Sequence, residues 1–186
     1  MNRGMKRDEL KYLVWISLGC FILSLVVGMI GSSFSFGSHA QLVSYSINDT
    51  LALAACVLAG RYVGSRGNHV AAAGFVMMGI VHGISAGGIG SSGISLDSVR
   101  LVIPLLPSIV FIAWCTLFPV WLRIVGMISI MPFIAMYWRV FHGLEYDHWT
   151  TYLAYVLLAI VEIVWGVYLV VDYWRLRPTS TSSASS

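Results

Sequence analysis

Residues 150–172 have the sequence TTYLAYVLLAIVEIVWGVYLVVD, in which only Glu162 and Asp172 are charged. A helix needs about 20 predominantly apolar residues to cross a hydrocarbon core that is about 30 Å thick. This stretch is long and apolar enough to do so, and it therefore predicts a transmembrane helix. The helix would carry the carboxyl group of Glu162 near the middle of the membrane.

Five further stretches are of similar length and composition. They lie near residues 12–31, 42–62, 70–89, 99–118 and 120–141. Only 10% of the whole chain is charged, against about 25% in soluble proteins. We therefore expect an all-α polytopic membrane protein with six transmembrane helices in a single domain at residues 1–177. The Ser- and Thr-rich tail at 178–186 is expected to be disordered, because it is too polar and too short to fold alone.

The basic residues predict how these helices are oriented. Of the eleven Lys and Arg residues, nine fall on one side of the predicted membrane: Arg3, Lys6, Arg7, Lys11, Arg61, Arg66, Arg123, Arg175 and Arg177. Arg100 and Arg139 lie on the other side. Short cytoplasmic loops are enriched in Lys and Arg, so both termini are expected to be cytoplasmic, in a plasma membrane of the bacterial inner-membrane type.

Charge and cysteine content narrow the classes of function. The net charge of +3 comes from the cytoplasmic flanks, where it suits an anionic lipid surface, so the expected partner is the bilayer and not a nucleic acid. Association with another membrane protein or with a second copy of the chain is also possible.

The cysteine content excludes a further class. Cys20, Cys56 and Cys115 each lie inside an apolar stretch without a C-x-x-C pair, which excludes a disulfide framework. The first apolar run is longer than a signal-peptide core, which favours a retained helix over a cleaved one.

Four polar residues inside the predicted helices are candidates for a site. They are Asn48, Asp49, His82 and Glu162. A charged side chain at the bilayer centre costs about 2.5–3.5 kcal/mol on insertion scales, so such residues face the bundle interior and mark a site or pathway. Asp49, His82 and Glu162 share a narrow band of depth, which predicts a ligand- or proton-binding site. The competing interpretation is a hydrogen bond between helices, with His82 as an ordinary core residue.

Glycine and proline residues predict how the helices pack and bend. Gly79, Gly83 and Gly87 recur at four-residue steps, a pattern that lets a second helix approach closely. Pro104 and Pro107 in the fourth stretch and Pro132 in the fifth each remove a backbone donor. We expect kinks at these positions.

Two groups contain residue types that ligate metals. Met77, Met78 and His82 are close in sequence, but haem would need a second axial ligand at matched depth, and Met in an apolar helix usually serves packing. His142, Glu145, Asp147 and His148 lie in one predicted outer loop with a spacing that matches no zinc motif. We therefore predict no metal site, leave metal binding by the outer loop open, and assign no cofactor.

The segment Gly90-Ser-Ser92-Gly93 precedes the fourth apolar stretch. It resembles the G-x-S-G motif of rhomboid intramembrane proteases, as do the six predicted helices and Asn48 in the second. The resemblance implies Ser92 as nucleophile, His148 as its base and Asn48 as the oxyanion-stabilising residue. The chain departs from that family in having Ser44 in place of a histidine one turn before Asn48, and no histidine inside the sixth stretch.

The leading hypothesis is a small membrane protein that binds or conducts a small solute or ion at a polar site in the outer half of the bundle, for transport or sensing. This hypothesis assigns no catalytic residues. A rhomboid-like protease or an inactive relative, and a membrane subunit of a larger complex, are the alternatives.

Overall fold

The computed structural model describes residues 7–35, 37–89, 103–142 and 148–176. These residues form helices and turns and contain no strand, so the predicted all-α fold is confirmed for this part of the chain. The elements are α1 (Arg7–Ser32), α2 (His39–Ser65), α3 (His69–Ile84), the π-helix η1 (Ser85–Ile89), α5 (Leu105–Ala113), α6 (Val120–Ile128), α7 (Met131–Phe141) and α8 (His148–Arg175).

Within the described ranges, five helical segments are long and apolar enough to cross a membrane. They are Arg7–Ser32, His39–Ser65, His69–Gly87, Val120–Arg139 and Tyr152–Arg175. Their outer surfaces carry large apolar side chains, among them Ile22, Val57, Ile80, Ile124 and Ile160, each more than 40% exposed. A soluble monomer rarely exposes apolar surface of this extent, so the fold is that of an integral membrane protein.

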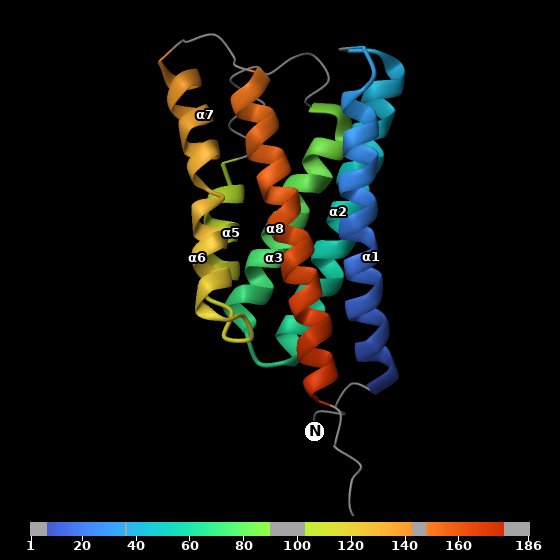
Figure 1. Ribbon diagram of the computed structural model, residues 1–186, viewed down its shortest axis with the longest axis vertical. Coiled ribbons are helices and arrows are strands. Elements are labelled where there is room, and N and C mark those ends of the chain that lie inside the picture. The colour runs from blue at the N-terminus through green and yellow to red at the C-terminus, as the bar shows by residue number, and fades with distance from the viewer. Residues whose placement is uncertain (1–6, 36, 90–102, 143–147, 177–186) are drawn as a thin grey trace, which may run out of the picture.

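The helices form an elongated bundle in which α8 packs against α1, α2, α6 and α7. Figure 1 shows α8 at the centre, with α1 and α2 on one side and α6 and α7 on the other. Helix α3 packs between α2 and α5. The start of α1 at Arg7 and the end of α8 at Arg175 lie at the same end of the bundle (Figure 1), which we call the basal end.

The expected continuous helix at 99–118 differs from the structure. Residues 99–102 lie outside the described ranges, and α5 covers only the nine residues Leu105–Ala113. After Trp114 the chain turns, because the N–H of Thr116 donates to Oδ1 of Asn68 at 2.8 Å instead of continuing the helical pattern. Pro119 follows, and a residue before proline is disfavoured in helical geometry. This segment is therefore not among the five that are long enough to span.

The expected helix at 120–141 is broken in its middle. Helix α6 ends at Ile128 and α7 begins at Met131. Pro132 has no N–H to donate to the carbonyl of Ile128, which is the bond that a continuous helix would need. Just after the end of α6, the hydroxyl of Ser129 donates to the carbonyl of Gly126 at 2.6 Å. The predicted kink at Pro132 therefore takes the form of a short interruption.

The interior is centred on Trp165 of α8, which is completely buried. Its indole ring stacks on Phe118 with ring centroids 6.2 Å apart, and it meets Phe75 edge-on at 5.8 Å. Gly126 lets α6 approach, because a Cβ built there would lie 3.0 Å from the indole. This aromatic cluster joins α3, the α5–α6 connection, α6 and α8 in one core.

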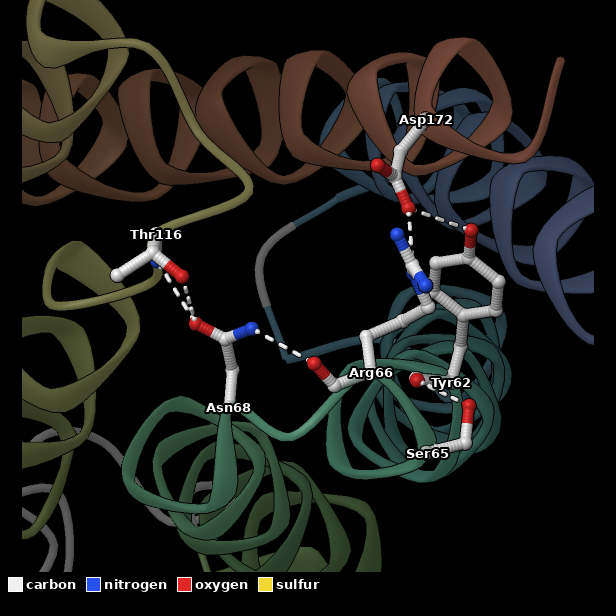
Figure 2. Close-up of polar contacts among 6 residues, drawn as sticks. All are labelled: Tyr62, Ser65, Arg66, Asn68, Thr116 and Asp172. Carbon is white, nitrogen blue, oxygen red and sulfur yellow. Dashed lines mark hydrogen bonds and ion pairs between the residues drawn. The ribbon is translucent and has the colours of Figure 1, made fainter. Parts of the chain in front are cut away.

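Polar contacts tie the basal ends of several helices together (Figure 2). Oδ2 of Asp172 on α8 accepts hydrogen bonds from the Tyr62 hydroxyl at 2.7 Å and from Nε of Arg66 at 3.1 Å. Asn68 accepts from both the N–H and the hydroxyl of Thr116. The connection between α2 and α3 is therefore fastened to α8 on one side and to the α5–α6 connection on the other.

Candidate functional site

Three titratable side chains from three helices meet inside the bundle. Nδ1 of His82, on α3, lies 3.0 Å from Oδ1 of Asp49 on α2. Nε2 of the same ring lies 3.2 Å from Oε1 of Glu162 on α8. His82 therefore bridges two carboxyl groups, and we call these three residues the His82 site.

Each residue of the His82 site is directed inward by the apolar face of its helix. On α8, Glu162 shares a face with Leu158, Trp165 and Leu169, all buried and spaced three or four residues apart. On α3, His82 follows the buried Met78 by one turn. At a rise of 1.5 Å per residue, all three positions lie about 20–24 Å along their helices from the basal end. Apolar packing thus carries the polar groups into the interior at one height.

Burial at the His82 site is high. His82 is 8% exposed and Glu162 3% exposed, whereas the Asp49 side chain keeps 17% of its surface accessible. Ionised carboxylates can only accept hydrogen bonds, so the two contacts of the ring require two protons shared among the ring nitrogens and the carboxyl groups. Both protons can be on the ring, beside two carboxylates, or one can be on the ring and the other on a carboxyl group. In each case the three side chains have a net charge of −1. The site is therefore suited to a cation.

Asn48 lies apart from this group. Its Oδ1 accepts a hydrogen bond from the Ser24 hydroxyl of α1 at 2.8 Å, and it lies beside Gly28, where a Cβ would come within 3.1 Å of Oδ1. Consecutive residues point about 100° apart around a helix. Asn48 and Asp49 therefore face different neighbours, and Asn48 joins α2 to α1.

Cys56 also lies beside the His82 site, although the sequence analysis did not identify it as a site residue. Its thiol sulfur, a ring nitrogen of His82 and a carboxylate oxygen of Glu162 all lie within 4.8 Å of one another. Cys56 is completely buried. It follows Asp49 by seven residues, which is two helical turns, so both side chains lie on the same face of α2. That spacing is the signal that could have placed Cys56 beside the site.

The backbone next to the site is also unusual. Helix α3 continues directly into the five-residue π-helix η1, which starts three residues after His82 and packs against α2. Short π-helical segments are uncommon and are found frequently at functional sites. The predicted glycine pattern lies on the same stretch. Gly79 and Gly83 face Leu53 of α2, whereas a Cβ built on Gly87 would have no side chain or neighbouring helix of the described residues within 4 Å.

The other candidates from the sequence lie elsewhere. Nδ1 of His142 lies 2.9 Å from the carbonyl of Trp138, and its ring packs on the indole of Trp138. Glu145, Asp147 and the side chain of His148 lie outside the described part of the chain, as does Ser92. The structure therefore does not describe the serine and histidine on which the rhomboid resemblance depends.

A comparison with protein families, with curated proteins and with solved structures found no match in any of the three.

Proposed function

We propose that this protein is a membrane-embedded receptor or transporter for a small cation, which it binds at the His82 site. The observation that carries the proposal is the bridge from Asp49 through His82 to Glu162 inside an apolar bundle. With both termini cytoplasmic, the site would lie in the outer half of a plasma membrane of the bacterial type. Transport and sensing both need such a site.

The distribution of charge at the ends of the bundle supports this orientation. The described Lys and Arg residues lie at the basal end, apart from Arg139 in the last turn of α7, which Figure 1 places at the opposite end. Basic residues are concentrated on the cytoplasmic side of membrane proteins. The basal end is therefore the proposed cytoplasmic end.

The energetic cost of burying charged groups supports a binding role for the three side chains. A buried ion pair is not usually present for stability. Removing its charges from water costs several kcal/mol per ion, and well-packed apolar residues of similar volume often give the same stability or more. Polar groups at this depth usually line a pathway or site. The competing account is that the three residues only fasten α2, α3 and α8 together, and it predicts a loss of stability without any loss of binding.

The test is cation binding by the purified protein in detergent, with the affinity tag removed. Isothermal titration against Na⁺, K⁺, Mg²⁺, Ca²⁺, Mn²⁺ and Zn²⁺ should identify at least one ion that binds. Asp49→Asn and Glu162→Gln should each weaken that binding at least tenfold, or about 1.4 kcal/mol. The matched control is Asp172→Asn, whose side chain is also 17% exposed but pairs with Arg66 at the basal end.

Wild-type affinity in both Asp49→Asn and Glu162→Gln, together with a lower unfolding temperature, would refute the proposal and leave the purely structural account. Flux of the identified ion into proteoliposomes then separates transport from sensing. A transporter accumulates the ion, and Glu162→Gln abolishes the accumulation.

A further inference from the structure

We infer that the cation held at the His82 site is a divalent transition metal of the zinc class, with Cys56, His82 and Glu162 as its protein ligands. This inference rests on the proposed function and specifies its ligand. The three residues come from three helices and are at least nine-tenths buried. Their ligand atoms already lie within 4.8 Å of one another.

The distances fit a tetrahedral site after a small adjustment. Zinc–sulfur bonds of about 2.3 Å and zinc–nitrogen or zinc–oxygen bonds of about 2.0–2.2 Å place neighbouring ligand atoms about 3.3–3.8 Å apart in a tetrahedron. Nε2 of His82 and Oε1 of Glu162 are 3.2 Å apart. Moving the sulfur of Cys56 inward would complete three of the four positions. Zinc sites with three protein ligands keep the fourth position for water or an exchanging group.

The types of ligand select the metal. A thiolate is a soft ligand and an imidazole suits zinc, copper, iron or nickel, whereas Mg²⁺ and Ca²⁺ prefer sites made of oxygen atoms alone. Cys56 is therefore the residue whose presence favours a transition metal over a hard cation such as Mg²⁺ or Ca²⁺. Without Cys56, the His82 site would offer one nitrogen and carboxylate oxygens.

Asp49 has a separate role in this arrangement. A histidine that binds a metal almost always donates its other ring N–H to a carboxylate or carbonyl, which fixes the tautomer and the orientation of the ring. Asp49 lies at 3.0 Å from Nδ1 of His82 and so leaves Nε2 for the metal. Asp49 is thus a positioning residue and not a ligand.

The charges balance when the metal enters. Binding displaces the thiol proton of Cys56 and the proton shared between Nε2 of His82 and Glu162, while the Nδ1 proton stays on the ring. Two protons leave as one divalent ion arrives, so the net charge of the buried site does not change. The large cost of adding a charge to an apolar interior is thereby avoided.

The experiment uses Zn²⁺ and the spectroscopic probe Co²⁺ on the purified full chain in detergent. We expect one metal ion per chain and a sulfur-to-cobalt charge-transfer band from the wild-type protein. Cys56→Ser should remove the band and weaken Zn²⁺ binding at least tenfold. Asp49→Asn should keep the band but weaken binding by about 10–100-fold, as loss of such a partner does in other metal sites. The matched control is Cys20→Ser in α1, which should change neither result.

The outcomes separate this inference from the proposed function. Co²⁺ binding without a thiolate band, or wild-type Zn²⁺ affinity in Cys56→Ser, would overturn the metal assignment. The proposed function would survive that result if another cation still required Glu162. Both ideas fail if no cation depends on Glu162. The band of the wild-type protein decides the question even if Cys56→Ser does not fold.

Discussion

At the scale of single residues, His82 is the side chain that bridges the buried carboxyl group of Glu162 and the partly buried carboxyl group of Asp49. Asp49 and Glu162 each contact a different nitrogen of its ring. Removing one partner of a buried pair costs about 3–5 kcal/mol, because a charge is left without compensation. The consequences of losing His82 and of losing one carboxylate should therefore differ.

His82→Leu should lower the free energy of unfolding by about 3–5 kcal/mol, because it leaves the buried Glu162 and the partly buried Asp49 without the ring that bridges them. Glu162→Gln should cost less, since its amide oxygen can still accept from a ring N–H. Denaturant unfolding in detergent, with a chelator present to exclude metal effects, measures both. Equal losses in the two variants would show that His82 does not act through the carboxyl groups.

At the scale of helices, the closest backbone contact described at a glycine joins α3 to α5. A Cβ built on Gly74 would lie 2.7 Å from the carbonyl oxygen of Ser108 and 2.9 Å from the amide nitrogen of Ile112. These are backbone atoms, so side-chain rotation cannot relieve the clash. Gly74 thus allows the short α5 to pack directly on α3, the helix that carries His82.

Gly74→Ala should destabilise the protein by about 1–3 kcal/mol, the usual cost of overpacking. Gly83→Ala on the same helix is the control. Its Cβ would lie 3.6 Å from the flexible Leu53 side chain, and alanine is favoured over glycine within helices. Thermal unfolding followed by circular dichroism should show a lower midpoint for Gly74→Ala alone. A similar decrease in both variants would mean that the α3–α5 contact is not specific.

At the scale of the whole molecule, orientation depends on which end of the bundle is cytoplasmic. Arg7 and Arg175 share the basal end, together with the connection between α2 and α3 (Figure 1). All of these positions should be inaccessible from outside an intact cell. The loops predicted at the opposite end should be accessible.

A membrane-impermeant thiol reagent added to intact cells should label Phe36→Cys and Glu145→Cys. It should leave Ser65→Cys and Thr179→Cys unlabelled until the membrane is permeabilised. The wild-type protein, whose Cys56 and Cys115 are buried, gives the background. Labelling of Ser65→Cys from outside would overturn the orientation expected from the sequence. Labelling of both Ser65→Cys and Phe36→Cys from outside would also overturn the six-helix topology.

Several features could be predicted from local sequence because they depend on local physical chemistry. The ability of a helix to insert into a membrane follows from its apolar length. Four of the predicted segments, 12–31, 42–62, 70–89 and 150–172, therefore correspond to the long apolar helical segments that contain α1, α2, α3 and most of α8. The common depth of Asp49, His82 and Glu162 follows from counting residues along each helix. The break near Pro132 follows from its missing N–H.

The tertiary structure decided which faces of the helices meet, since that depends on contacts between residues far apart in the chain. Asn48 and Asp49 have the same depth, but the rotation of α2 directs one toward Ser24 and the other toward His82. Cys56 is uncharged and lies in an apolar helix, so the sequence does not distinguish it from a core residue. Only the packing of α2 against α3 and α8 places it beside Glu162. Beyond the end of α5 at Ala113, the N–H of Thr116 donates to Oδ1 of Asn68, a residue 48 positions earlier in the chain. Hydropathy measures the average environment of a helix, whereas these contacts depend on its rotation and its partners.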